Sequence, residues 1–78
     1  MKNVIIYSTP TCHYCQMAKE FFKENNIVYT EHNVAVDRVA GQESIKKSGQ
    51  MGVPVIDVDG EIIIGFDEDK LRELLGVK

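Results

Sequence analysis

The sequence predicts an α/β protein in which the order β-α-β-α-β-β-α forms a four-stranded mixed sheet with helices on both faces. A continuous β-prone run at residues 4–7 is followed by a helical pattern and a second strand-like segment, and the strands of such a unit lie parallel. Nearer the C-terminus, Asp59-Gly60 separates two short apolar runs, which is the strongest short-range signal for an antiparallel hairpin. A sheet that contains both pairings is a mixed sheet.

The first predicted helix spans residues 12–25 and precedes a strand at residues 27–34. Its charged residues occupy one side, and its apolar residues recur at helical spacing on the other. The apolar side consists of Cys15, Ala18, Phe21 and Phe22. We therefore expect this helix to pack one side against the sheet.

The second predicted helix, residues 37–47, begins at Asp37, a residue type that is favoured as an N-cap. Gly41 weakens the helix by about 1 kcal/mol relative to alanine. The apolar face is thin and consists of Val39, Ala40 and Ile45. This segment therefore has the weakest pattern of the three predicted helices.

The hairpin and the last helix complete the chain. Strands at residues 55–58 and 61–64 flank Asp59-Gly60, and a type I′ turn needs positive φ at both of these positions. Asp67 is a good N-cap for the last helix, and Gly76 ends that helix. The expected buried stripe of the helix consists of Leu71, Leu74 and Leu75.

Length and composition place the chain among small globular proteins. Its 78 residues are enough for one domain, residues 1–78, and hydrophobic and charged fractions of 44% and 27% are ordinary. The net charge of −3 argues against a nucleic-acid-binding module, because phosphate binding needs a basic surface. No apolar run approaches the roughly 20 residues of a membrane span, and the N-terminus lacks a secretory pattern. We therefore expect a cytoplasmic protein, monomeric and without membrane or nucleic-acid partners.

The two cysteines, Cys12 and Cys15, form a Cys-x-x-Cys pair. A disulfide across so short a loop stabilises a fold by only about 2 kcal/mol before strain, against about 3 for a 15-residue loop. A small secreted scaffold would carry more cysteines, which bridge distant segments. The pair therefore fits a bond that opens and closes better than a structural one.

The position of the pair at the start of a helix favours redox chemistry. Free helix N–H groups and the helix dipole stabilise a thiolate, and such contexts lower a cysteine pKa from about 8.5 to roughly 3.5–7.5. We assign Cys12, nearest the helix end, as the nucleophile, and Cys15, one turn further in, as the more buried resolving thiol. A protonated His13 would lower the thiol pKa further, whereas a solvent-facing His13 would change it little. His32 is expected to be a structural or surface residue.

Metal binding is the alternative reading of the same residues. A structural zinc site usually needs four Cys or His ligands, and this chain offers two thiols, His13 and His32. His13 is poorly placed to share a metal with both flanking thiols. A half-site completed by a second chain would give a metal- or iron–sulfur-bridged dimer that acts as a carrier or sensor.

Three motifs carry a family resemblance: Cys12-His13-Tyr14-Cys15 after the first strand, then Gly52-Val53-Pro54, then Gly65-Phe66-Asp67. In this order they resemble the glutaredoxin branch of the thioredoxin-fold superfamily, over essentially the whole chain and closest to short bacterial and archaeal glutaredoxin-like redoxins. The resemblance implies a thioredoxin/glutaredoxin fold and a dithiol–disulfide oxidoreductase with no bound cofactor. Its substrates would be disulfides in proteins or small molecules. Glutathione or a flavoprotein of the thioredoxin-reductase type would supply the electrons.

The resemblance also implies a substrate groove. Val53-Pro54 would be a cis peptide that faces the cysteines, with the Val53 backbone pairing with the substrate chain as a short added strand. Tyr14 would line the groove, and Gly65, Phe66 and Asp67 would form its rim, where helix N–H groups accept a carboxylate. The simpler alternatives are a trans proline that begins an edge strand and an ordinary strand-to-helix turn.

The chain departs from glutathione-using glutaredoxins at three places. His13 replaces the usual proline, Ser8 stands at the position of a carboxylate-binding lysine, and residues 50–52 lack a basic residue ahead of the Val-Pro unit. Lost cations weaken the binding of a dianionic ligand without forbidding it. Lys46 or Lys47 is a possible substitute. The departures favour a flavoprotein reductase as electron source.

Overall fold

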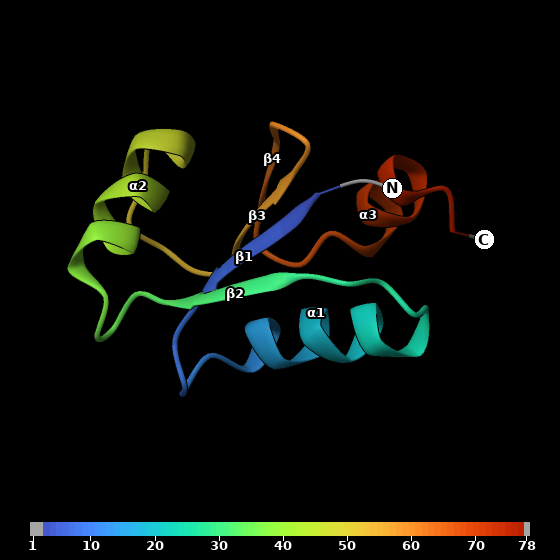
Figure 1. Cartoon of the computed structure of the whole chain (residues 1–78), viewed down its shortest axis with the longest axis horizontal. Helices are drawn as coiled ribbons and strands as arrows, with labels where there is room; N and C mark the ends of the chain where they lie inside the picture. The colour runs from blue at the N-terminus through green and yellow to red at the C-terminus, as the bar shows by residue number, and fades with distance from the viewer. Residues whose placement is uncertain (1–2, 78) are drawn as a thin grey trace.

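The computed structural model describes residues 3–77 and contains four strands and three helices in the predicted order (Figure 1). The elements are β1 (Val4–Ser8), α1 (His13–Glu24), β2 (Thr30–Asn33), α2 (Arg38–Ser48), β3 (Val55–Val58), β4 (Glu61–Ile64) and α3 (Glu68–Leu75). The predicted order and mixed sheet are therefore confirmed, and the arrangement is the one that the resemblance to glutaredoxins implies. No helix within residues 3–77 is long and apolar enough to cross a bilayer.

The sheet has the strand order β2-β1-β3-β4. β1 pairs with β2 in parallel, and β3 is antiparallel to both β1 and β4. In this register Ile6 lies opposite Ile56, which in turn lies opposite Ile63. Because side chains alternate between the faces of a sheet, this register gathers the three isoleucines on one face.

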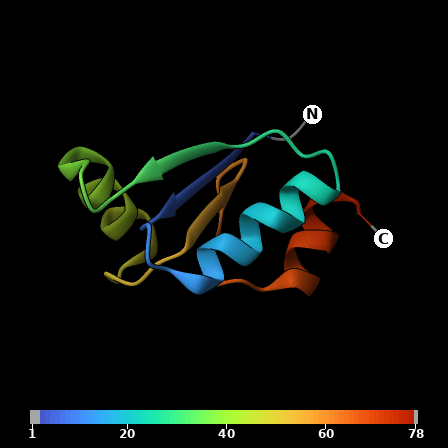
Figure 2. The same cartoon turned by 90° about the horizontal axis from the view of Figure 1, so that it is seen from below.

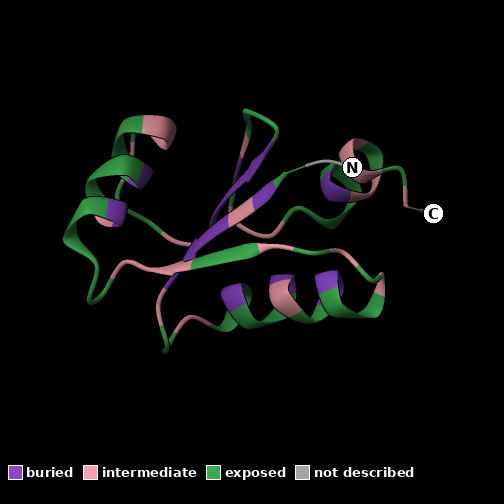
Figure 3. Cartoon of the chain, viewed as in Figure 1, coloured by how far each residue is buried: buried purple, intermediate pink, exposed green. Residues whose placement is uncertain are grey.

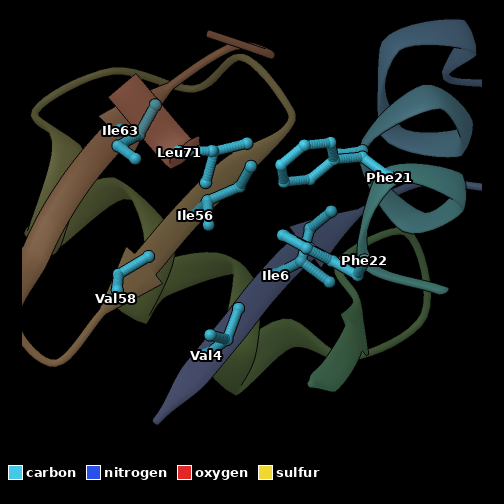
Figure 4. Packing of buried hydrophobic residues seen from close by; sticks show 9 residues of the cluster. Val4, Ile6, Phe21, Phe22, Ile56, Val58, Ile63 and Leu71 are labelled. Carbon is cyan, nitrogen blue, oxygen red and sulfur yellow. The ribbon is translucent and has the colours of Figure 1, made fainter. Parts of the chain in front are cut away.

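Helices α1 and α3 cover that face and lie next to each other, away from α2 (Figure 2). The buried residues of α1 lie on the side of the helix turned toward the sheet (Figure 3). Side chains from three strands and two helices meet in one apolar cluster (Figure 4). Its members are Val4, Ile6, Ala18, Phe21, Phe22, Ile56, Val58, Ile63 and Leu71.

Helix α2 covers the opposite face more thinly. The buried residues there are Tyr7, Ala40 and Val55, with three half-buried apolar neighbours. Our prediction that Val39 and Ile45 form the apolar face of α2 is wrong, because they are 73% and 40% exposed. The helix instead turns Ala40 and Ser44 toward the sheet. Each adjacent position is about 100° away around a helix, so Val39 and Ile45 point to either side of the contact.

The ends of the elements follow local sequence signals. Asp37 and Asp67 cap α2 and α3 by accepting the backbone N–H of Ala40 and Lys70, at 3.0 and 3.1 Å. The turn at Asp59-Gly60 has φ of 50° and 93°, which confirms the predicted turn chemistry. The second strand is shorter than the predicted 27–34, because the Ile27 N–H donates to the Phe22 carbonyl of α1 at 2.8 Å, so the segment starts as the end of that helix.

Candidate functional site

The structure joins Cys12 and Cys15 in a disulfide at the N-terminus of α1, with their Cα atoms 5.2 Å apart. The chain reaches this point through a turn at Thr9–Cys12, closed by the Cys12 N–H donating to the Thr9 carbonyl at 3.3 Å. Pro10 occupies the second position of the turn, where its fixed φ is favourable. The turn therefore places Cys12 immediately before the first residue of α1.

Cys12 is the N-cap of α1, and its sulfur accepts the backbone N–H of Cys15 at 3.1 Å. A helix N-terminus presents free N–H groups and the positive end of the dipole, so this sulfur occupies a position that stabilises negative charge. Cys15 is fully buried, whereas Cys12 is only half-buried. The predicted difference in burial is confirmed, and Cys12 is the more accessible of the two cysteines.

The two residues between the cysteines are exposed. Tyr14 is 60% exposed, and its ring contacts the ring of His13 edge-on at a centroid distance of 6.0 Å. An effect of His13 on the thiol pKa stays a prediction. His32 is half-buried and stacks on Tyr7 at 5.4 Å, as a structural residue does.

A backbone hydrogen bond connects the two predicted groove segments. Val53-Pro54 is a cis peptide, as predicted, with Pro54 buried and Val53 half-buried. The Pro54 carbonyl accepts the N–H of Gly65 at 2.9 Å. Gly65 has a φ of +81°, a conformation that favours glycine. This hydrogen bond holds the strand-to-helix turn against the segment that carries the cis peptide.

Phe66 and Asp67 link the same turn to two helices. The Phe66 ring packs on Phe21 of α1 at a centroid distance of 6.1 Å. Asp67 uses its carboxylate to cap α3. Both residues thus have structural contacts in the folded chain, and a substrate contact by either one stays a prediction.

Ser8 and its neighbours form a polar group at the C-terminal end of β1. The Ser8 hydroxyl donates to Glu31 at 2.8 Å, and Lys19 pairs with the same carboxylate oxygen at 2.8 Å. The hydrogen bonds from Lys19 and then from Ser8 hold the pKa of Glu31 below its usual range. Ser8, which stands where glutaredoxins carry a lysine, is therefore buried, and its hydroxyl is hydrogen-bonded to Glu31.

Lys47 does not supply the missing cation in the way we expected. Its Nζ lies 2.8 Å from Asp57, 2.9 Å from the Tyr7 hydroxyl and 3.3 Å from Glu43, between α2 and the sheet. Burial would lower the pKa of Lys47, but the hydrogen bonds to Asp57, Tyr7 and Glu43 outweigh it and raise this pKa. An ammonium engaged by two carboxylates is a poor partner for a third. Lys46 is exposed and stays a candidate.

Sequence reasoning missed this network. Burial, and next the hydrogen bond to Glu43, raise the pKa of Tyr7, whose hydroxyl donates to that carboxylate at 2.6 Å. The available signal was Asp57, an aspartate in the middle of an apolar strand. A buried carboxylate needs a partner, and Lys47 is the cation that meets it. Within residues 3–77, no group of three or more His, Cys, Asp or Glu side chains is placed to hold a metal ion.

Comparison with known proteins gives one consistent result. The glutaredoxin family model matches residues 4–63. The chain is 46% identical over 70 residues to the glutaredoxin-like 8.6 kDa protein in the rubredoxin operon of Clostridium pasteurianum, covering 90% of this chain and 93% of that one. It is 35% identical over 68 residues to glutaredoxin 3 of Escherichia coli, covering 87% and 82%. A mutant of the thioredoxin-like protein BC3987 superposes with a TM-score of 0.92 at 35% identity over the full length of both chains.

Proposed function

Because this chain belongs to the glutaredoxin family, we propose that it is a dithiol–disulfide oxidoreductase that reduces disulfides in proteins or small molecules. The observation that carries the proposal is the half-buried Cys12 sulfur at the N-cap of α1, bonded to the fully buried Cys15. This is the oxidised end state of the reaction. The reduced dithiol is the form that acts on a substrate.

In the first step, the Cys12 thiolate attacks one sulfur of a substrate disulfide. A Cys12–substrate disulfide forms, the substrate bond breaks, and the other substrate sulfur leaves as a thiolate that takes a proton from water. The N–H of Cys15 and the dipole of α1 stabilise the attacking thiolate. The N-cap position therefore acts in this step by keeping sulfur ionised near neutral pH.

In the second step, Cys15 loses its proton and attacks the Cys12 sulfur. The Cys12–Cys15 disulfide forms and the second substrate thiolate leaves, so two electrons have passed from the dithiol to the substrate. A Cα separation of 5.2 Å lies within the usual range for a disulfide, so the helix need not unwind for this step. Burial of Cys15 keeps this second thiol away from solvent oxidants until the mixed disulfide forms.

The substrate chain would lie along the backbone of Val53, opposite the cysteines, with Tyr14 beside it and Gly65, Phe66 and Asp67 at its edge. The Pro54–Gly65 hydrogen bond supports this assignment, because it holds the two groove segments together. His13 would tune the thiol from the exposed side. No bound cofactor is needed for either step.

For the electron source, we favour a flavoprotein of the thioredoxin-reductase type over glutathione. Ser8 and Lys47 support this choice. Ser8 is uncharged and donates to Glu31, and Lys47 is paired with Asp57, so neither offers a cation to a glutathione carboxylate. The protein would act as a monomer in a reducing compartment, the cytoplasm.

Single cysteine variants test the proposal. We expect Cys12→Ser to lose reduction of a model protein disulfide, and Cys15→Ser to accumulate a mixed disulfide at Cys12 that mass spectrometry detects. Full activity of Cys12→Ser would reject the assignment of the nucleophile. Turnover with NADPH and thioredoxin reductase should exceed turnover with glutathione and glutathione reductase. Equal turnover would remove the argument from missing cations.

A further inference from the structure

Residues of α1, α3 and the turn before α3 line an open hollow on the surface, which includes neither cysteine and which neither reaction step uses. Its volume is about 170 Å³, which is enough space for several water molecules. Aromatic and apolar side chains and four charged ones line it. The lining residues are Met17, Glu20, Phe21, Glu24, Phe66, Glu68 and Arg72.

The charged residues at the hollow are unbalanced. Three of them are glutamates and one is an arginine, so the hollow carries a net charge of −2. Glu20 and Glu24 stand at i and i+4 on α1, where like charges repel. Neither takes part in an ion pair within residues 3–77. These two carboxylates destabilise their own helix and would gain from a cation that arrives from outside.

The remaining two charged residues hold one guanidinium at this hollow, that of the chain's own Arg72. The Arg72 guanidinium lies over the Phe21 ring, with its carbon 5.2 Å from the ring centroid. Glu68 accepts two hydrogen bonds from the same group, at 2.9 and 2.7 Å. An aromatic face and a carboxylate together form a favourable site for such a cation. Glu20 and Glu24 offer two further carboxylates to the same hollow.

The hollow lies within reach of a polypeptide that is attached to Cys12. Glu20 follows Cys12 by eight residues along α1, which is a rise of about 12 Å. An extended chain covers that distance in about four residues. Phe66 belongs both to this hollow and to the proposed rim of the substrate groove, so the two surfaces are continuous.

We propose that this hollow binds an arginine or lysine side chain of a protein substrate, about four residues from the cysteine that Cys12 attacks. The aliphatic part of that side chain would pack on Met17 and Phe66, and its charged end would meet Glu20 and Glu24. The inference rests on the proposed function and adds to it a class of preferred substrate: disulfides in basic segments of proteins.

Peptides that release thionitrobenzoate from a single mixed-disulfide cysteine test this inference. Two peptides carry arginine four residues before or after the cysteine, and their controls carry citrulline, which has the same shape without the charge. At low salt, we expect one arginine peptide to react about three- to tenfold faster than its control, from two exposed charge contacts. High salt should remove most of the difference.

Variants decide whether the hollow is responsible. In Glu20→Gln/Glu24→Gln the arginine-to-citrulline rate ratio should fall to about one. In Glu61→Gln/Glu73→Gln, which changes the net charge equally away from the hollow, the ratio should persist. Equal rates for arginine and citrulline in the unaltered protein, or an undiminished ratio in the first variant, would overturn the inference while leaving the proposed function intact. No release from any peptide would overturn the proposed function and the inference with it.

Discussion

The two faces of the sheet are built on different principles. The face under α1 and α3 is closed by nine buried apolar residues, and it carries the redox pair at the end of α1. Among residues 3–77, the face under α2 has three such residues, and a polar network of Tyr7, Glu43, Lys47 and Asp57 completes it. The redox site thus begins on the helix with the largest apolar contact, which gives the Cys12 position a rigid support.

The stability of the α2 face therefore depends on charge interactions, whereas that of the α1 and α3 face depends on apolar packing. Apolar burial is nearly independent of pH and salt, whereas an ion pair responds to both. We therefore expect the α1 and α3 face to set the overall stability and the α2 face to set its pH dependence.

The largest expected effect comes from matched isoleucines on the two faces. Ile56 is fully buried beneath α1 and α3, whereas Ile62 is half-buried on the α2 face. We expect Ile56→Ala to lower the free energy of unfolding by about 2–5 kcal/mol, and Ile62→Ala by about 1 kcal/mol. Urea unfolding of the disulfide form measures both. Equal losses would show that the faces are packed alike.

The next effect comes from the ion pair on the α2 face. Lys47→Met would leave the buried Asp57 oxygen Oδ2 without its partner at 2.8 Å, while Oδ1 keeps the N–H of Gly60 at 2.6 Å. We expect a loss of about 1–3 kcal/mol, because an unpaired buried carboxylate is costly. The double variant Lys47→Met/Asp57→Asn, which keeps an acceptor for the Gly60 N–H, should recover most of it. A double variant as unstable as the single one would show that the ion pair itself stabilises the fold.

The pH dependence follows from the same network. Burial and Glu43 raise the pKa of Tyr7, and the hydrogen bonds to Asp57, Tyr7 and Glu43 outweigh burial and raise that of Lys47. A group whose pKa is raised on folding adds stability below its unfolded pKa and loses it as the pH rises through the folded value. Between neutral pH and about pH 9.5 the unfolding free energy of the disulfide form should therefore be flat, and it should decrease above about pH 10.

The double variant Tyr7→Phe/Lys47→Met is the control for this pH dependence, because it removes both titrating groups. Its unfolding free energy should be lower at neutral pH and should change less between about pH 9.5 and 11. An unchanged alkaline decrease in this variant would assign the effect to groups elsewhere in the chain.

The smallest effect is expected on the outer side of α2. Val39 is 73% exposed, so Val39→Ser should change the free energy of unfolding by less than about 0.5 kcal/mol. Its neighbour Ala40 meets the sheet and is 5% exposed, so Ala40→Leu should cost about 1–3 kcal/mol through overpacking. A large loss from Val39→Ser with a tolerated Ala40→Leu would reverse the orientation of α2.

Features of the fold with local causes could be predicted from the sequence. Asp37, Asp67 and Gly76 mark helix ends through contacts within one turn, and Asp59-Gly60 specifies its own turn. The Cys-x-x-Cys spacing placed the redox pair in the same way. Each of these signals acts over about four residues, so no knowledge of the packed structure is needed to interpret it.

The features that were missed depend on packing between distant segments. Which side of α2 meets the sheet is decided by the fit of Ala40 and Ser44 against the sheet, and local hydrophobicity favoured their neighbours instead. The partner of Asp57 lies ten residues away on another element. The hollow between α1 and α3 likewise exists only because two separate helices pack together, so no single segment could reveal it.

The central claim is that the start of α1 holds the Cys12 sulfur ionised. Ultraviolet absorbance of the thiolate in the reduced Cys15→Ser variant, followed across pH, measures the pKa of this sulfur alone. The backbone N–H at position 15 remains in that variant, so the helix end is intact. We predict a pKa between about 3.5 and 7.5. A value of about 8.5 or above, that of a free cysteine, would contradict the account.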